Sequence, residues 1–416
     1  MRILYLVHQF MPDFSGGTEQ VTLNLARAAQ SAGHRVDVFT VTAPDSPGWS
    51  ERDGLRFGVV EGVPVFALAH QDTPTVELGF GANPRLEAEF RRFLESRPAY
   101  DVAHVMHAFR LNEAAELLAA RRIPYVMTLT DFYSLCFRIN LVRLDGGLCD
   151  GPRQGEACAR HCATPELEPA AYADRVARTG RLLRRASAVA AVSDYVAQAV
   201  RAEHPDLDVR VIANGVDLLG LGAPARDPAS RSASGKLTLG YLGTVSEAKG
   251  AVMLAEAFAA ASPANARLRM VGPCHEPQSR ARVEALLGRA DITLDGPVAA
   301  SEVGRVLGGF DLLCVPSLVP EAFSLALHEG FAVGLPALVA DRGAPPLVVA
   351  ARGCGRVAPA GDVAAWARAI DDIAADPQQL TAWAARVPLP QRIEEEGFLY
   401  TELYRAAATA PDRTGD

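Results

Sequence analysis

The chain has 416 residues, of which 49% are hydrophobic, and this length is sufficient for two α/β domains with separate cores. Its formal net charge of −8 argues against a general affinity for nucleic acid. The sequence contains no run of about 18 apolar residues, and Met1 leads directly into a predicted strand, so we expect neither a signal peptide nor a membrane span. We therefore predict a cytoplasmic protein, with peripheral contact with the inner face of a membrane left open.

The first predicted domain begins with a strand, a loop and a helix. Residues 2–8 form a short apolar run typical of a buried parallel strand, and the helix follows at about residues 18–32. The loop between them carries Gly16, Gly17 and Glu19 in place of the G-x-G-x-x-G pattern of dinucleotide-binding proteins. Paired glycines allow a diphosphate to approach the backbone closely, although a flexible turn before a helix is the alternative.

Residues 43–84 show no regular pattern apart from short strand-like runs such as 63–67. A predicted helix at 83–97 leads to a strand at 101–106, and His107 follows that strand directly. His107 is either a site residue or a surface histidine, because a shift of one residue on a strand turns a side chain to the other face. We expect His104, inside the strand, to be structural.

A cysteine-rich segment follows the predicted strand at 125–129. Its spacing is C-x12-C-x8-C-x3-C, formed by Cys136, Cys149, Cys158 and Cys162. In a cytosolic protein such a cluster favours thiolate ligands of a structural zinc over disulfides, and free buried thiols or a redox pair are the alternatives. The segment is too long for a simple connection, so we expect a functional or metal-held insertion.

A predicted helix at 172–186 is rich in arginine. Spacings of three and four residues bring Arg175, Arg178, Arg181 and Arg185 close to one face. Such a face is suited to anionic lipid or to a phosphorylated acceptor, although a solvated face is the alternative. The domain ends with V-I-A-N-G-V-D at 211–217, and residues 218–235, rich in Ala, Pro, Ser and Gly, are predicted to be a linker.

The second predicted domain spans residues 236–392 and contains the most informative segment. A strand at 312–316 is followed by a helix predicted to begin near Glu321 and to end at Gly330 or Gly334, and then by a strand at 337–340. Glu329 lies eight residues after Glu321. The amides of the first helical turn, in Phe323, Ser324 and Leu325, are natural ligands for a phosphate.

This E-x7-E segment, with E-A-F-S-L at its start and G-L-P-A-L-V-A-D after it, resembles that of the retaining glycosyltransferases of family four. The resemblance implies the GT-B fold, with two Rossmann-like parallel-sheet domains facing each other across a cleft. These domains would be residues 1–217 and 236–392, with a last helix at 393–408 packing back on the first. An ordinary amphipathic helix with solvated acids is the alternative for the two glutamates.

The resemblance also implies a role for each matching residue. Glu321 would contact the donor sugar, Glu329 would hold the nucleotide ribose, and the backbone from Ala322 to Leu325 would hold the diphosphate together with Gly16, Gly17 and Lys249. Pro297 and Val298 would meet the nucleotide base. Three positions depart from the family pattern: Thr244 stands where an arginine is expected, Leu347 stands where a glutamate is expected, and Met106 replaces a histidine that His107 follows one place later. On the acceptor side the matching residues are Glu19, Asp131 and Arg138.

The function implied is retaining transfer of a sugar from a nucleoside diphosphate sugar of UDP or GDP type. Its acceptor would be a hydroxyl group of a glycan, a lipid-linked glycan or a small molecule. The catalytic residues would be Glu321, Lys249 and His107, and no catalytic metal would be required because Lys249 and backbone amides replace the divalent ion. The alternatives are a nucleotide-sugar epimerase or pseudo-glycosyltransferase, a catalytically idle partner subunit, and a lipid-surface binding module.

Overall fold

The structure is a computed structural model that describes residues 1–69, 76, 78–218, 220–221 and 235–409. The chain divides into two compact units. The N-terminal unit comprises Met1–Gly215 and the C-terminal helix α15 (Ile393–Thr409), and the C-terminal unit comprises Val216–Arg392. Most of the predicted linker at 218–235 lies outside the described residues. Within those described ranges, no helix is both long and apolar enough to cross a membrane.

The N-terminal unit is built on one mixed sheet with the strand order β3-β4-β5-β2-β1-β6-β7-β8-β9. All pairings from β5 to β9 are parallel, whereas β3 and β4 are antiparallel additions at one edge. The strands are β1 (Arg2–Leu6), β2 (Arg35–Thr42), β3 (Ser50–Arg52), β4 (Leu55–Val60), β5 (Val63–Ala69), β6 (Val102–Val105), β7 (Tyr125–Leu129), β8 (Ala188–Ala191) and β9 (Val209–Val211).

The strand-like run at 63–67 is part of β5, but the expectation that the rest of residues 43–84 is irregular is wrong, because β3, β4 and β5 form two consecutive hairpins there. Each hairpin turns through two residues with positive φ, first Asp53 and Gly54 and then Glu61 and Gly62. Such turns match the twist of the flanking strands, and Asp-Gly is a strong sequence signal for them. The first hairpin, which turns at Asp53 and Gly54, was therefore detectable from the sequence.

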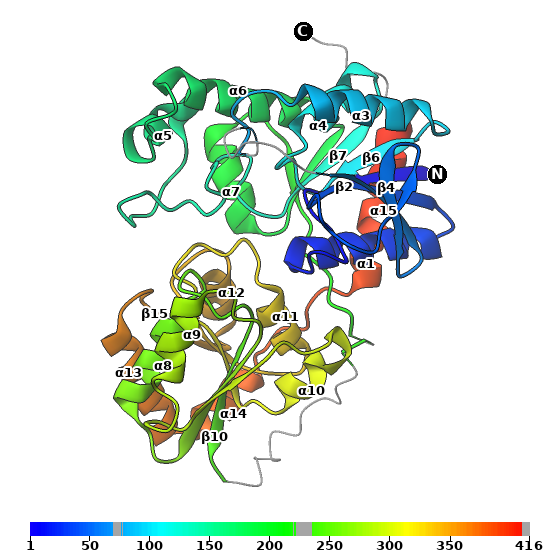
Figure 1. Ribbon diagram of the computed structural model, residues 1–416. Helices are drawn as coiled ribbons and strands as arrows, with labels where there is room; N and C mark the ends of the chain where they lie inside the picture. Colours follow the sequence, from blue (N-terminus) through cyan, green and yellow to red (C-terminus); the bar gives the residue numbers. More distant parts are fainter. Residues whose placement is uncertain (70–75, 77, 219, 222–234, 410–416) are drawn as a thin grey trace. The chain divides into compact units, whose positions relative to one another are not determined.

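Helices cover both faces of this sheet, with α3, α4 and α6 gathered on one face and α1 and α15 on the other (Figure 1). Their bounds are α1 (Gly17–Ser31), α3 (Pro84–Glu95), α4 (Asn112–Ala120), α6 (Pro169–Arg185) and α7 (Asp194–Glu203), and the short α5 (Glu156–His161) lies in the cysteine-rich segment. Helix α15 binds the sheet through buried hydroxyl groups. The Tyr404 hydroxyl lies 2.7 Å from Nδ1 of His104, whose Nε2 lies 2.7 Å from the Thr128 hydroxyl. Burial lowers the pKa of His104 to about 3, so its predicted structural role is confirmed.

The predicted basic face of α6 does not form. Arg175 is buried and donates to the carbonyl oxygens of Leu78 and Tyr133, at 2.8 and 2.7 Å. Arg178 forms ion pairs of 2.7 Å with Glu113 and Glu116 on α4. In a chain with so little lysine, arginine supplies the hydrogen bonds that tie this helix to its neighbours. The four arginines therefore do not form one continuous basic face, because Arg175 and Arg178 are engaged within the protein. Contact of the remaining exposed arginines with lipid stays a prediction.

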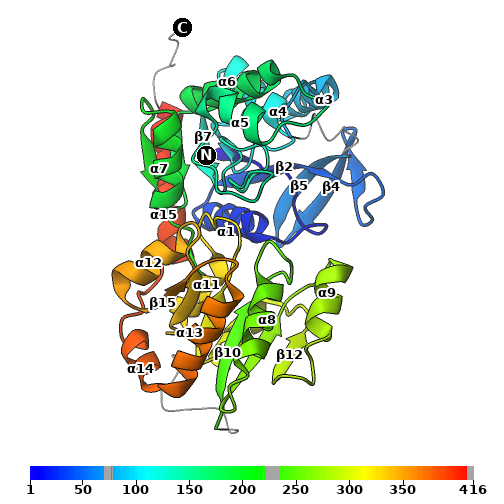
Figure 2. The same cartoon turned by 90° about the vertical axis from the view of Figure 1, so that its left-hand side faces the viewer.

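The C-terminal unit has an all-parallel sheet with the strand order β12-β11-β10-β13-β14-β15. One core joins α8, α9, α13 and α14 to a face of this sheet, and a second core joins α10, α11 and α12 to the other face (Figure 2). The strands are β10 (Leu237–Leu242), β11 (Ala266–Val271), β12 (Ile292–Asp295), β13 (Leu312–Val315), β14 (Ala337–Ala340) and β15 (Gly355–Ala358). The helices are α8 (Ala251–Ala261), α9 (Pro277–Glu284), α10 (Val303–Gly308), α11 (Leu325–Ala332), α12 (Pro345–Arg352), α13 (Val363–Ala375) and α14 (Gln378–Ala384).

Helix α11 begins at Leu325, four residues later than predicted. The preceding residues are held in a different pairing, because Glu321 forms an isolated β-bridge with Gly343 and its carbonyl accepts a hydrogen bond from Ala344 N–H at 2.8 Å. Gly343 permits this close approach, since a Cβ there would lie 2.2 Å from the Glu321 carbonyl oxygen. Ser324 then turns the chain with a φ of 74° before the helix starts.

Candidate active site

The strand orders locate a ligand-binding edge in each unit. In the N-terminal unit the order changes direction between β1 and β6, and in the C-terminal unit it changes direction between β10 and β13. In such sheets the loops that follow the two central strands diverge, and ligands bind in the crevice that they leave. The loops after these strands carry the predicted residues Gly16, His107, Lys249 and Glu321.

In the C-terminal unit the structure brings Lys249 and Glu321 together. The Lys249 Nζ lies 2.8 Å from Glu321 Oε1, and the two side chains are 45% and 14% exposed. Their loops are joined by the backbone, because Leu318 N–H donates to the Ala248 carbonyl at 3.0 Å. Gly250 permits this contact, since a Cβ there would lie 1.9 Å from the carbonyl oxygen of Pro316. The result is a half-exposed ammonium group in the loop after β10. Its N–H groups that do not point at Glu321 can donate to an anionic ligand.

Glu329 lies in the same helix that follows Glu321. Burial raises the pKa of its carboxyl group to about 7. No hydrogen bond or ion pair joins this carboxyl group to another residue in the described part of the chain. The side chain is half-buried. A carboxyl group in such surroundings is costly in its charged form unless a ligand supplies donors, and a vicinal diol supplies two.

The unpaired amides at the start of α11 differ from those predicted to meet a phosphate. Because α11 begins at Leu325, its first-turn amides without a partner in the preceding turn are those of Leu325, Ala326 and Leu327, whereas Phe323 and Ser324 precede the helix. Ala322 also lies before the helix. Thr244 is exposed, while Pro297 and Val298 follow the edge strand β12.

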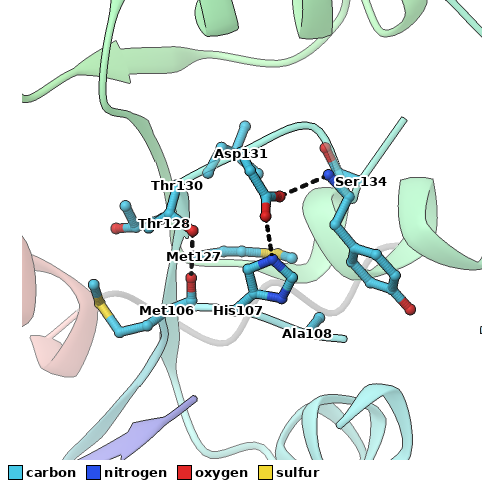
Figure 3. A pocket seen from close by; sticks show the side chains of 10 residues that line it. Met106, His107, Ala108, Met127, Thr128, Thr130, Asp131 and Ser134 are labelled. Atoms are coloured by element: carbon cyan, nitrogen blue, oxygen red, sulfur yellow. Dashed lines mark hydrogen bonds and ion pairs between the residues drawn. The ribbon is translucent and has the colours of Figure 1, made fainter. Parts of the chain in front are cut away.

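In the N-terminal unit His107 and Asp131 form a hydrogen-bonded pair beside a small pocket (Figure 3). Phe109 N–H donates to His107 Nδ1 at 3.1 Å, so the proton of the neutral ring is on Nε2 and is donated to Asp131 Oδ2 at 2.5 Å. Both ring nitrogens are therefore engaged within the protein. The Asp131 side chain is 26% exposed against 3% for His107, so Asp131 is the member of the pair that can meet a ligand.

Several neighbours fix the loop after β7 that carries Asp131. Tyr133 N–H donates to Asp131 Oδ1 at 2.8 Å, and the Tyr133 carbonyl accepts a hydrogen bond from Arg175. The Thr179 hydroxyl donates to the Ser134 carbonyl at 2.8 Å. Helix α6, whose arginines were compatible with a lipid-facing or a solvated surface, supports this loop, because Arg175 and Thr179 both belong to it.

His8, which sequence reasoning missed, completes this group of residues. Its ring lies 4.2 Å from that of His107, measured between centroids, and its Nε2 lies 3.9 Å from Glu19 Oε1. Burial and the neighbouring His107 lower the pKa of His8 well below its usual value. His8 lies two residues after the end of β1, so its place beside His107 depends on the strand order, which the sequence does not reveal.

Glu19 is only 2% exposed and occupies the start of α1. Burial raises its pKa, and hydrogen bonds with its own backbone, Gln9 and the Gly16 backbone oppose that rise. Gly16 makes room for it, since a Cβ there would lie 2.6 Å from Glu19 Oε2. The carboxyl group therefore already lies at the helix terminus where a diphosphate was expected to meet Gly16 and Gly17.

The predicted zinc site is not formed. Among the described residues no group of three or more His, Cys, Asp or Glu is arranged to hold a metal ion, and Cys136, Cys149, Cys158 and Cys162 are free thiols. Cys158 and Cys162 pack in a small core with Phe80, Phe137 and Tyr172, which holds the segment by apolar contact. Burial, with the neighbouring thiols, raises the pKa of Cys158 to about 12. Arg138, predicted to face the acceptor, is half-buried in the same segment.

Comparison with known proteins decides the family. Residues 16–215 match the model of the glycosyl transferase 4-like domain, and residues 224–389 match that of the glycosyl transferases group 1. The chain belongs to glycosyltransferase family four. Among curated proteins, this glycosyltransferase is 26% identical over 393 residues to a D-inositol 3-phosphate glycosyltransferase of Rhodococcus opacus, covering 90% of this chain and 81% of the relative.

Solved structures share the fold of this glycosyltransferase. A sucrose-phosphate synthase of Thermosynechococcus elongatus superposes with a TM-score of 0.69 at 20% identity, covering 97% of this chain and 98% of the other. The Anabaena protein HepE in complex with UDP and glucose superposes with a TM-score of 0.66 at 18% identity, covering 96% and 98%. These likenesses support the GT-B fold for its two Rossmann-like units.

Proposed function

We propose that this glycosyltransferase moves a sugar from a nucleoside diphosphate sugar to a hydroxyl group, with retention of the anomeric configuration. One observation carries the proposal. The Lys249–Glu321 pair, the start of α11 and the half-buried acid Glu329 lie in the segments after β10 and β13, where the strand order of the C-terminal sheet changes direction. These groups supply a cation, backbone donors and a diol acceptor, which are the groups that a nucleoside diphosphate needs.

The donor is of UDP type in this proposal. The Anabaena protein with the same fold was solved with UDP and glucose, which supports a uridine nucleotide as the first candidate. Glu329 would accept hydrogen bonds from the ribose hydroxyls, and the amides of Leu325, Ala326 and Leu327 would meet the diphosphate. Pro297 and Val298 would contact the base through the backbone.

Departure of the diphosphate is the step that these residues assist. Lys249 would leave its pair with Glu321 to meet the developing phosphate charge, which a fixed cation stabilises strongly where water is excluded. Glu321 would then be free to accept a hydrogen bond from a hydroxyl group of the sugar. A divalent metal is not required in this account, because Lys249 and the amides provide the positive charge. The departing phosphate would take the acceptor proton.

The acceptor would be held by the N-terminal unit. Asp131 is held in place by His107 and Tyr133 and has an exposed face, which supports its role as the residue that binds the acceptor hydroxyl. His107 would act through Asp131 instead of touching the donor sugar. The curated relative acts on D-inositol 3-phosphate, so a phosphorylated polyol is the first acceptor to test, ahead of a glycan or a lipid-linked glycan.

The test is a transfer assay with UDP-glucose, GDP-mannose and UDP-N-acetylglucosamine, each with inositol 3-phosphate or with water as the acceptor. We expect one donor to release its nucleoside diphosphate, and the anomeric proton in the product to keep the donor's configuration by NMR. Inversion would contradict retention. Tight binding of a donor without turnover under any condition would instead favour an idle partner subunit.

A further inference from the structure

The residue before α11 has an unusual backbone conformation. Ser324 has φ 74° and ψ 91°, and it serves as the N-cap of the helix without a hydrogen bond from its side chain. Residues other than glycine rarely adopt a positive φ, and they keep it only where surrounding contacts hold it. Ser324 sets the direction in which the amides of Leu325, Ala326 and Leu327 point. Something must therefore hold Ser324 in place.

The contacts that hold it come from His328, one turn into the helix. His328 Nδ1 lies 2.9 Å from the Ser324 carbonyl oxygen, and since that oxygen can only accept, the ring donates through Nδ1. The ring stacks flat on Phe323, with centroids 3.8 Å apart and planes 8° apart. His328 therefore contacts the residue before the turn and the carbonyl group at its end.

The surroundings of His328 keep this arrangement in one protonation state. Burial lowers the pKa of His328 to about 4, so the ring is neutral near pH 7. The edge of Phe331 closes another side, at 5.7 Å between centroids. An apolar side chain would fill this space equally well, as the neighbouring buried residue Leu327 does at its own position. An apolar side chain would not donate to Ser324.

We propose that His328 is a positioning residue that holds Ser324 in the left-handed conformation and so keeps the first-turn amides of α11 directed at the donor diphosphate. The inference rests on the proposed function for the role of those amides, and on the contacts above for the clamp itself. Its distinguishing consequence is that His328 matters only because residue 324 has a side chain. Glycine adopts a positive φ without that cost.

The experiment compares the parent with His328→Leu, Ser324→Gly and the double variant, using UDP-glucose as the probe in calorimetry. We expect His328→Leu to weaken binding about tenfold, and Ser324→Gly to stay within about threefold of the parent. In the double variant the affinity should return to that of Ser324→Gly. His328→Phe, which keeps a ring on Phe323 without the donor, should lose affinity and be rescued in the same way.

Equal loss of affinity from His328→Leu in both backgrounds would overturn the inference, because it would mean that the ring only fills space. A second measurement stands apart from the donor: hydrogen exchange over residues 323–328 of the free proteins. Exchange should be faster in His328→Leu than in the parent, but little changed by His328→Leu in the glycine background. If the parent binds no nucleotide sugar, the proposed function fails, and this exchange pattern alone decides whether the clamp exists.

Discussion

At the scale of single residues, Glu329 links donor binding to pH. Its pKa of about 7 means that roughly half of the free protein carries the neutral acid at neutral pH. The carboxylate accepts hydrogen bonds from both ribose hydroxyls more strongly than the neutral acid, one of whose oxygens carries a proton. Affinity should therefore be lost as the pH falls through 7, by up to about tenfold between pH 8 and pH 6.

Calorimetry with UDP-glucose tests this, since its diphosphate does not titrate in that range. Glu329→Gln should bind UDP-glucose more weakly at pH 8, by about 1.5–3 kcal/mol, and should show no pH dependence between 6 and 8. A variant that binds as tightly as the parent would remove Glu329 from the ribose site.

Asp131 provides a second prediction at the scale of single residues. It distinguishes a role in binding the acceptor from a role in binding the donor. Asp131→Asn keeps the shape of the side chain but removes its charge, so transfer to the acceptor should fall at least about tenfold while UDP-glucose affinity changes less than about twofold. Asp145→Asn, an exposed position in the same segment, is the matched control and should leave both unchanged. Loss of donor affinity in Asp131→Asn would contradict the assignment.

The burial of the cysteine thiols leads to a prediction about the metal content of the protein. Their burial raises the pKa values of Cys136, Cys158 and Cys162, so these thiols stay protonated near neutral pH. Metal analysis of the purified protein should find well below about one zinc per chain, and the thiols should be alkylated slowly until the protein is unfolded. One tightly bound zinc per chain would contradict the apolar packing described above.

At the scale of elements, α15 carries a buried acid that opposes folding at high pH. Glu396 accepts a hydrogen bond from Gly215 N–H at 2.8 Å, and burial raises its pKa to about 8, with the hydroxyl groups of Tyr5, Tyr400 and Tyr404 around it. Because the folded pKa exceeds the unfolded value, the native state binds the proton more tightly. Stability should therefore fall as the pH rises from about 4.5 to about 8.

Glu396→Gln removes the charge and keeps an oxygen for Gly215. At pH 8.5 the free energy of unfolding of the variant should exceed that of the parent by on the order of 3 kcal/mol, so the variant should unfold at a higher temperature. This difference should shrink toward pH 5. Thermal unfolding at the two pH values measures this. A difference that is the same at both values would mean that Glu396 is not protonated in the folded protein.

A helix or strand can be predicted from the sequence when the interactions that set its position are between residues close together in the chain. The E-x7-E segment was recognisable because strand, helix and glycine signals lie within about thirty residues. The start of α11 was misplaced because Glu321 pairs with Gly343, which no local pattern indicates. The arginines of α6 form the expected helix, but their partners lie far away in the sequence, so their inward direction was not predictable.

At the scale of the whole molecule, the resemblance to the family-four glycosyltransferases implied two parallel-sheet domains, and the order of the strands then determined which loops lie together. His8 and His107 come from loops about a hundred residues apart and meet only because β1 and β6 are neighbours. Lys249 and Glu321 meet for the same reason across β10 and β13. Strand order depends on packing between distant segments, which is why the sequence suggested Lys249, Glu321 and His107 but neither their pairing nor His8.

The central claim is that Lys249 supplies the charge that lets the diphosphate depart. Its pair with Glu321 is half-exposed and contributes little to folding, so Lys249→Ala should hardly change the melting temperature. Lys236, which pairs with Asp291 at 2.8 Å, is the only other lysine in the sequence and provides a matched control.

The decisive measurement is the turnover of Lys249→Ala and Lys236→Ala with the same donor and acceptor. We predict a loss of at least about a hundredfold for Lys249→Ala, near 2.7 kcal/mol, and a change of less than about threefold for Lys236→Ala. If Lys249→Ala also transfers sugar within about threefold of the parent, the diphosphate is stabilised by other groups and the account of the C-terminal unit is wrong.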